Sequence, residues 1–403
     1  MRLRLLVSFG AAALFASFLP ALPLEGYASA QAVQRTQAQT AGQEEQNGTV
    51  AYFVGTHAGS FVAAGHFVVG DYPYDVVAAD LNGDGLVDLA VANADGKSVT
   101  LLYGFAATAC QPHPTLLPGN GPTALVATDL NKDGHLDLAV ADSGDNEVVV
   151  FVGYQYGTFR QPYRFTVGSR PTALVSADFN NDGIPDLATA NTGDASLTVL
   201  LGDGDGHFRP GSTIATGQSP DALVARDLNG DGIPDLADTN FSDGTVSTFF
   251  SNGNGTFRLG QTVKVGGQPD AIAAGDFNGD GVTDLAVANF ADSSVTVLLG
   301  SPDGTFKVGG TVATGSNPDG IAVGDFNGDG IPDLVTADYG DQALTVLNGK
   351  GDGTFTWSRN IPLASHPTSV IAADINGDGI PDLAVTLPSS GAKAPSELQL
   401  PQQ

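Results

Sequence analysis

Several residue types are scarce in this chain of 403 residues, and each scarcity narrows the possible class of protein. Cys110 is the only cysteine, so disulfide bonds within one chain are excluded and other interactions must stabilise the fold. Lysine and arginine number 16 against 44 acidic residues, and the formal net charge of -28 argues against nucleic acid or an anionic membrane as a partner. Glutamate is rare, so the acidity is almost wholly aspartate, the residue that turns and calcium cages use.

Long hydrophobic runs are also missing, except at the N-terminus. Two arginines precede an apolar run over residues 5–24, and an A-x-A cleavage site ends at Ala30. This order is typical of a signal peptide over residues 1–30; the alternative is an uncleaved anchor, because the run is nearly long enough to span a bilayer. Residues 31–48 are polar and lack periodicity, which indicates a flexible linker. We therefore expect a secreted or extracytoplasmic protein with no stable membrane insertion after signal cleavage.

The sequence D-x-N-x-D-G-x-x-D occurs seven times, and each copy begins 49 residues after the last. The first copy begins at Asp80 and the seventh at Asp374, with no insertion or deletion between them. A strict period of this length is typical of stacked supersecondary units and argues against one continuous core.

Each copy of the motif is dense in hard oxygen ligands. Asp80, Asn82, Asp84 and Asp88 place side-chain oxygens at loop positions 1, 3, 5 and 9, and the variable position 7, Leu86, can offer its backbone carbonyl. This donor set favours Ca²⁺ over Zn²⁺ or copper, and it suits Mg²⁺ less well. Position 6 is always glycine, which a sharp turn with positive φ requires. The alternative is that these residues serve only as Asx-turns.

Because every copy places four potential ligands at the same loop positions, Ca²⁺ binding is favoured over a turn role alone, and up to seven Ca²⁺ are expected. Without metal the three carboxylates of each loop would repel one another, so we expect stability to depend on calcium. The candidate metal ligands are the residues at positions 1, 3, 5 and 9 of the seven loops: Asp80, Asn82, Asp84, Asp88, Asp129, Asn131, Asp133, Asp137, Asp178, Asn180, Asp182, Asp186, Asp227, Asn229, Asp231, Asp235, Asp276, Asn278, Asp280, Asp284, Asp325, Asn327, Asp329, Asp333, Asp374, Asn376, Asp378 and Asp382.

Each unit also contains four short strand signals, here named A to D. In the unit around Asp276 they read PDAIAAGDF, DLAVAN, SVTVLLG and KVGGTVATG, bounded by Gly, Asp, Asn and Pro. Units of this length with four antiparallel strands are propeller blades. A parallel β-helix, the alternative for Gly- and Asp-rich repeats, has a far shorter period.

The two ends of the repeat array complement each other. The last motif leads into residues 367–387 and then stops after strands A and B, whereas residues 49–61 align with residues 294–306, which contain strand C and the turn into strand D. The N-terminal segment therefore supplies strands C and D of the last blade, and closure leaves no open sheet edge. We predict an all-β, seven-bladed propeller of four-stranded antiparallel blades over residues 49–391, with a tail at 392–403.

The motif D-x-N-x-D-G-x-x-D-L, the A-V-A-N that follows it and the later G-x-x-D-G-T-F resemble the FG-GAP/VCBS repeats, which also occur in integrin α-subunits. The resemblance covers residues 49–387 and implies Ca²⁺ binding through loop positions 1, 3, 5 and 9 and the position 7 carbonyl. It also implies a role in adhesion or recognition. Two segments depart from the pattern: residues 104–121 lack D-G-T-F, and Phe159 follows Y-Q-Y-G-T. Both leave the outer edge of a blade less well defined.

Ligand binding is expected on the face opposite the ion loops. Strands alternate in direction, so the B–C hairpins and D–A connections share that face, and the hairpin sequences vary. Phe241, Phe290 and Tyr339 occupy the same hairpin position in three consecutive blades, where they could stack on sugar rings or anchor a protein. The alternative is that they pack between blades and cover the strand ends.

Catalytic motifs are not evident: G-x-S-x-G, H-E-x-x-H and a Ser/His/Asp arrangement are all missing, and we assign no catalytic residue. We interpret the chain as a monomeric, non-catalytic recognition or adhesion module for extracellular protein or carbohydrate. The alternatives are a polysaccharide-active enzyme, such as a lyase, and a subunit whose partner carries the activity.

Overall fold

The computed structural model describes residues 47–56, 59–104, 111–112 and 115–389. The predicted signal peptide, Cys110 and the predicted tail lie outside the described residues, as does most of the predicted linker. In the described part of the chain, no helix is long and apolar enough to cross a membrane.

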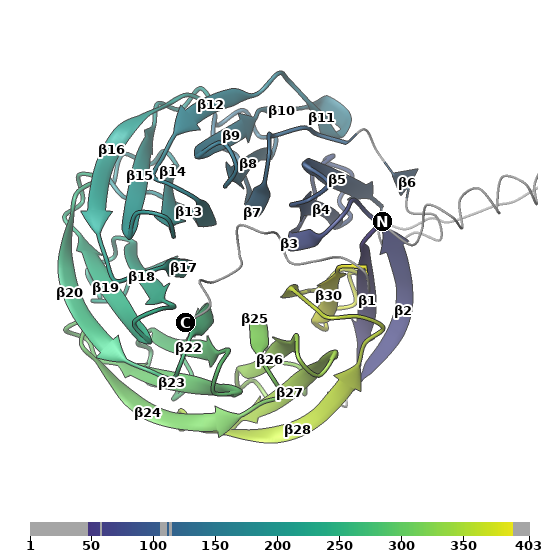
Figure 1. Cartoon of the computed structure of the whole chain (residues 1–403), viewed down its shortest axis with the longest axis vertical. Helices are drawn as coiled ribbons and strands as arrows, with labels where there is room; N and C mark the ends of the chain where they lie inside the picture. The colour runs from purple at the N-terminus through teal and green to yellow at the C-terminus, as the bar shows by residue number, and fades with distance from the viewer. Residues whose placement is uncertain (1–46, 57–58, 105–110, 113–114, 390–403) are drawn as a thin grey trace, which may run out of the picture. The chain divides into compact units, whose positions relative to one another are not determined.

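The described residues form seven four-stranded antiparallel sheets arranged as a ring (Figure 1). Blades 1 to 3 consist of β3 (Pro73–Ala79), β4 (Asp88–Asn93), β5 (Ser98–Tyr103) and β6 (Gln111–Pro112); β7 (Pro122–Thr128), β8 (Asp137–Asp142), β9 (Glu147–Phe151) and β12 (Tyr163–Thr166); and β13 (Pro171–Ala177), β14 (Asp186–Asn191), β15 (Ser196–Gly202) and β16 (Phe208–Ala215).

Blades 4 to 7 consist of β17 (Pro220–Arg226), β18 (Asp235–Asn240), β19 (Thr245–Ser251) and β20 (Phe257–Lys264); β21 (Pro269–Gly275), β22 (Asp284–Asn289), β23 (Ser294–Gly300) and β24 (Phe306–Ala313); β25 (Pro318–Gly324), β26 (Asp333–Asp338), β27 (Ala343–Gly349) and β28 (Phe355–Pro362); and β29 (Ser369–Ala373), β30 (Asp382–Leu387), β1 (Thr49–Gly55) and β2 (Phe61–Val68). The predicted seven-bladed propeller is confirmed.

The N-terminal strand completes blade 7, as the end alignment predicts. Strand β1 pairs antiparallel with β30, from Thr49 opposite Leu387 to Phe53 opposite Leu383. Val50 has no solvent exposure, so the closure is a packed seam. The Tyr52 hydroxyl also donates a hydrogen bond of 2.9 Å to Asp382 of the last ion loop.

The hydrophobic core lies between neighbouring blades. Strands β22 and β26 are buried over all six residues, whereas the rim strand β24 is exposed or partly buried after its first residue, Phe306. Phe277, from the blade 5 ion loop, meets Phe355 of the blade 6 D-G-T-F turn edge-to-face, with ring centroids 5.4 Å apart. The same contact recurs between blades 3 and 4 and between blades 6 and 7, which explains the phenylalanines in both motifs.

The two segments that depart from the repeat pattern form irregular blade edges. In blade 1 the outer strand shrinks to β6, and Val99 forms a separate bridge with Leu116. In blade 2 the Y-Q-Y-G-T segment forms the short pair β10 (Gly153–Tyr154) and β11 (Thr158–Phe159) around a turn of 3-10 helix, η1 (Gln155–Gly157). The missing D-G turn chemistry accounts for both irregularities.

Asp238 on β18 is a buried carboxylate at a position where the other blades have Val or Thr. Its Oδ2 accepts a 2.7 Å hydrogen bond from Thr216, but Oδ1 has no hydrogen-bond partner. Burial raises the pKa of Asp238 to about 7. Because the pKa is raised in the folded state, the contribution of Asp238 to the free energy of unfolding is fully present at low pH and is lost as the pH rises through about 7.

We therefore expect Asp238→Thr to raise the melting temperature by about 2–4 °C at pH above 7, and by less near pH 5. The reverse exchange in blade 3, Thr189→Asp, is the matched control and is expected to lower it. Thermal unfolding by circular dichroism at both pH values measures the effect. A lower melting temperature for Asp238→Thr would show that the carboxylate stabilises the fold.

Candidate functional site

The ion loops share one backbone conformation that glycine makes possible. Gly85 at loop position 6 has φ of +85°, and the position 6 glycine has positive φ in all seven copies. Gly83 at position 4 has φ of +76°. Side-chain-bearing residues rarely adopt this region, so the predicted turn requirement is confirmed.

Loop positions 1, 3 and 5 hold their side chains by hydrogen bonds from the loop's own backbone. Both carboxylate oxygens of Asp80 accept amide bonds, from Gly83 at 2.7 Å and Gly85 at 2.8 Å. Asn82 Oδ1 accepts from the Asp84 amide at 2.8 Å. The turn chemistry of the Asx-turn alternative is therefore present, and it orders these oxygens at the exposed end of the loop.

Loop position 9 differs from the others because its carboxylate is buried. Asp88 has no solvent exposure, and it accepts hydrogen bonds from the amides of Leu81 at 3.0 Å and Gly104 at 2.8 Å. Burial raises the pKa of Asp88 to about 6, and the charges of Asp84 and Asp80 add to the shift. Each of the other six position 9 aspartates also accepts bonds from two such backbone amides.

The residue types of the loops suit calcium, but the side chains are not arranged to bind it. Within the described ranges, no group of three or more His, Cys, Asp or Glu side chains is placed so that it could hold a metal ion. A carboxylate has about four lone-pair sites, so oxygens that accept one amide retain acceptor capacity. The hard oxygens of positions 1, 3, 5 and 9 and the position 7 carbonyl therefore fit Ca²⁺ chemically, but the side chains must shift to converge.

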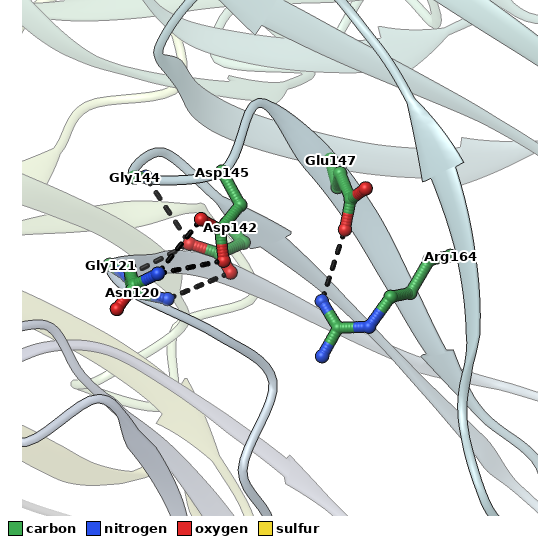
Figure 2. Close-up of polar contacts among 7 residues, drawn as sticks. All are labelled: Asn120, Gly121, Asp142, Gly144, Asp145, Glu147 and Arg164. Atoms are coloured by element: carbon green, nitrogen blue, oxygen red, sulfur yellow. Dashed lines mark hydrogen bonds and ion pairs between the residues drawn. The ribbon is translucent and has the colours of Figure 1, made fainter.

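On the opposite face, aspartates at the B–C hairpins accept hydrogen bonds from the D–A connections, and Figure 2 shows those of blade 2. In blade 2, Asp142 accepts hydrogen bonds from the amides of Asn120 at 3.0 Å and Gly121 at 2.8 Å, and the Asn120 side chain donates to Asp145 at 2.8 Å. Burial raises the pKa of Asp142, and the hydrogen bond from Asn120 lowers that of Asp145. In blades 3 to 6 a backbone amide of the D–A connection donates instead to the corresponding aspartate: Asp194, Asp243, Asp292 and Asp341. These hairpin aspartates are scaffold, although the hairpin sequences vary.

The three hairpin aromatics differ in exposure. Phe241 is buried, with its ring centroid 6.5 Å from that of Phe290, so it packs between blades as the alternative interpretation expects. Phe290 and Tyr339 are half-buried, and Tyr339 stacks on His366 with ring centroids 4.6 Å apart. Only the latter two rings retain surface for a ligand.

A cavity of about 200 Å³ lies at the mouth of the central channel and is lined by all seven inner strands. The second residue of each strand A signal, directly after its proline, lines it: Tyr74, Thr123, Thr172, Asp221, Asp270, Asp319 and Thr368. Where this residue is threonine, its hydroxyl donates to the proline carbonyl of the next blade, as Thr368 does to Pro73 at 2.7 Å. Aspartate cannot make this bond when ionised, so the channel has a carboxylate side formed by blades 4 to 6.

Asp75 also lines the cavity, where it accepts hydrogen bonds from the amides of Val76 and Leu125. The other three channel carboxylates, from Asp221, Asp270 and Asp319, interact strongly because they are adjacent and enclosed. Burial, followed by the charge of Asp319, raises the pKa of Asp270 well above its ordinary value. Burial also raises the pKa of Asp319 to about 6 and raises that of Asp221. Burial and the charges of all three raise the pKa of the Tyr74 hydroxyl. The sequence analysis missed this group, although Pro-Asp recurs at 49-residue spacing in three consecutive units.

A family model described as FG-GAP-like repeat matches five overlapping segments of the chain, residues 129–189, 178–237, 227–287, 276–336 and 325–385. The chain belongs to the FG-GAP-like repeat family. No curated protein matches this sequence.

Several solved structures resemble the FG-GAP propeller in fold. A putative 6-phosphogluconolactonase from Bacteroides uniformis has a TM-score of 0.64 at 14% identity, covering 80% of this chain and 98% of that chain. A periplasmic gluconolactonase from Pseudomonas aeruginosa has a TM-score of 0.58 at 17% identity, covering 79% and 97%. An Agrocybe aegerita lectin specific for non-reducing terminal N-acetylglucosamine has a TM-score of 0.52 at 16% identity, covering 85% and 96%. At these identities the likeness shows the fold alone.

Proposed function

We propose that this FG-GAP propeller is an exported calcium-binding module that recognises an extracellular protein or carbohydrate without transforming it. The observation that carries the proposal is the repetition of one oxygen-rich loop in all seven blades, which gives the ion face a uniform structure. The other face varies and surrounds a polar cavity, as expected of a binding surface on a rigid scaffold.

Calcium would be held by the side chains of loop positions 1, 3, 5 and 9 and by the position 7 carbonyl. Its charge would offset the crowded loop carboxylates, including the buried one at position 9. The ion thus has a structural role in this proposal. It would link the exposed loop side chains to the position 9 carboxylate, which already accepts hydrogen bonds from two backbone amides.

Export is supported by the N-terminal sequence alone, through its arginines, apolar run and A-x-A site. In an extracellular setting calcium at about 10⁻³ M would reach modules with dissociation constants of about 10⁻⁴–10⁻³ M. A chain with a single cysteine would then depend on metal and inter-blade packing for stability outside the cell.

A polysaccharide-active enzyme is the second candidate, and the channel mouth is the observation in its favour. Carboxyl groups with raised pKa beside a tyrosine are typical of acid–base sites. Recognition remains the better proposal, because no lysine, arginine or histidine is among the described residues that line the cavity. An eliminating enzyme would need such a cation to stabilise the developing anion.

Binding and turnover can be separated by a glycan array and degradation assays on the same polysaccharides, all in calcium. We expect retention of at least one glycan or extracellular protein, unchanged ligand after long incubation, and loss of retention in EDTA. Unsaturated or shortened products would contradict the recognition proposal and support the enzyme. A heat-unfolded sample controls for non-specific retention.

A further inference from the structure

The C–D turn of blade 2, which lies on the ion face, differs from the corresponding turns of the other blades. Tyr156 occupies the position at which blades 3 to 6 have aspartate or asparagine, and no residue of the turn is acidic. Tyr156 is 82% exposed and Tyr154 is 48% exposed. Strands β10 and β11 bring the turn to the outer edge of the ring (Figure 1). A ring as exposed as that of Tyr156 contributes little to the hydrophobic core.

The backbone of this region is strained at two residues. Tyr156 has φ of +62°, and Lys132, at position 4 of the blade 2 ion loop, has φ of +60°. Position 4 is glycine in five of the other loops and Asn181 in blade 3. The other described side-chain-bearing residues with positive φ lie in turns of the opposite face. Glycine would be less strained than lysine or tyrosine, so blade 2 carries a cation and an aromatic ring at two positions that local structure does not favour.

A guanidinium group and an imidazole ring lie beside Tyr154. The guanidinium carbon of Arg160 lies 5.3 Å from the centroid of the Tyr154 ring, and the His135 ring centroid lies 6.3 Å from the same centroid. Arg164 of the same blade pairs with Glu147 at 3.0 Å, whereas Arg160 forms no ion pair with any described residue. A guanidinium held over a ring keeps the N–H donors of its own plane for a planar acceptor such as a carboxylate.

The turn is fastened to the neighbouring blade, so these side chains are presented on a fixed support. The Tyr103 hydroxyl of blade 1 donates a hydrogen bond to the Gly157 carbonyl. A Cβ added to Gly157 would lie 2.7 Å from the Tyr103 ring, so the contact needs glycine at this point. Phe159 packs against the same core cluster as Tyr103. A preformed turn pays little ordering entropy when a ligand binds.

The ion loop of blade 2 is also the least repulsive to an anion. Lys132 is the one lysine or arginine in any of the seven ion loops. With calcium bound as proposed, its three carboxylates, the lysine and the ion leave no net charge, whereas each other loop keeps one negative charge. At physiological ionic strength charges are screened over about 8 Å, so the local balance at this turn matters more than the net charge of -28.

We propose that the C–D turn of blade 2 binds the uronic acid residues of an acidic polysaccharide. Arg160 donates paired hydrogen bonds to the sugar carboxylate, and the sugar ring lies against Tyr154 and Tyr156. An acidic peptide fits less well, because β10 and β11 pair over two residues each and offer too short an edge for an added strand. This site is separate from the hairpin face, and it rests on the proposed function only through the calcium ion that neutralises the blade 2 loop.

The proposal is tested by surface plasmon resonance of the calcium-loaded protein over two immobilised polysaccharides, hyaluronan and glucuronoxylan, at physiological ionic strength. Each is compared with its carboxyl-reduced form, which differs only in the charge. At least one acidic form is expected to bind at least about tenfold more tightly than its reduced form, which corresponds to about 1.4 kcal/mol. An acidic peptide and a sulfated dextran are the competitors.

Arg160→Gln removes the unpaired guanidinium and is expected to weaken binding of the acidic polysaccharide at least about tenfold. Arg164→Gln, the same change at the paired arginine of the same blade, is the matched control and is expected to leave binding unchanged. Tyr156→Gly is expected to weaken binding about three- to tenfold without lowering the melting temperature, because glycine adopts positive φ without strain. Tyr156→Phe keeps the ring and is expected to retain binding.

Four outcomes would overturn the proposal: no binding to either acidic polysaccharide, equal binding of acidic and reduced forms, equal loss in Arg160→Gln and Arg164→Gln, or competition by the peptide or the sulfated dextran as strong as that by the free uronate polymer. A lower melting temperature in Tyr156→Gly would assign that ring a structural role and would also count against it. If the glycan array yields another calcium-dependent ligand while no uronate binds, the recognition role stands and the uronate site fails.

Discussion

Chelation of calcium is expected to lower the melting temperature by about 4–14 °C relative to a sample in about 1 mM Ca²⁺. Sites with dissociation constants of about 10⁻³–10⁻⁴ M each contribute about 0.4–1.4 kcal/mol at that concentration. Seven sites that unfold together contribute about 3–10 kcal/mol, which the unfolding entropy of a propeller of this size converts into the stated shift. Differential scanning calorimetry in EDTA, and again after calcium is restored, measures it.

One loop can be removed to show that the shift comes from the ion loops. Asp280→Ala in blade 5 takes away position 5, and it is expected to reduce the calcium-dependent shift by roughly one seventh, since one of seven loops is lost. Asp303→Ala removes a carboxylate from the exposed D-G-T turn of the same blade and serves as the matched control. Magnesium is expected to restore little of the shift, because it retains its waters. An unchanged melting temperature in excess EDTA would refute the structural role of calcium.

The calcium-dependent part of the melting temperature is expected to grow as the pH rises from about 5 to about 7.5. In the metal-free protein, burial raises the pKa of the position 9 aspartates, to about 6 in Asp88. A raised folded-state pKa means that the stability is present at low pH and is lost as the pH rises through about 6, so the metal-free protein melts at lower temperature at about pH 7.5 than at about pH 5. Bound calcium requires the ionised form and opposes this loss.

The difference between calcium and EDTA samples isolates the ion loops from other buried carboxylates. Asp238 and the three channel carboxylates also have raised pKa values, so the stability of the protein falls through them too as the pH rises. They have this effect in both samples, and the difference cancels it. Thermal melts at four pH values with and without calcium therefore suffice. A difference that stays constant across this range would mean that calcium, if it binds, does not neutralise the buried position 9 carboxylates.

The ring, its seven blades and its closure are all predictable from the sequence because they depend on periodicity. A spacing of 49 residues without insertions fixes the strand order, and the phase of Val50 places β1 beside β30. The turn chemistry is equally local, since glycine at loop position 6 has the positive φ that its place in the motif predicts. Irregular edges occur at the two segments that lack the repeat pattern.

The direction and surroundings of individual side chains are less predictable. Position 9 looks equivalent to positions 1 and 5 in sequence, yet Asp88 faces inward to two backbone amides because it begins a buried strand. The hairpin aspartates look like variable surface, although tertiary hydrogen bonds use them. The three channel carboxylates meet only when the ring brings Asp221, Asp270 and Asp319 together; the recurring Pro-Asp pair marks them in the sequence but does not show that they are neighbours.

The central claim is that each of the seven loops binds one calcium ion. The most direct test is elemental analysis of the purified protein after desalting from millimolar Ca²⁺, with free metal set by equilibrium dialysis and bound metal measured by mass spectrometry. The account predicts a bound calcium content that rises toward seven per chain as free calcium increases, with Asp280→Ala reducing the limit by one. A chain that binds no calcium at millimolar concentration would contradict it.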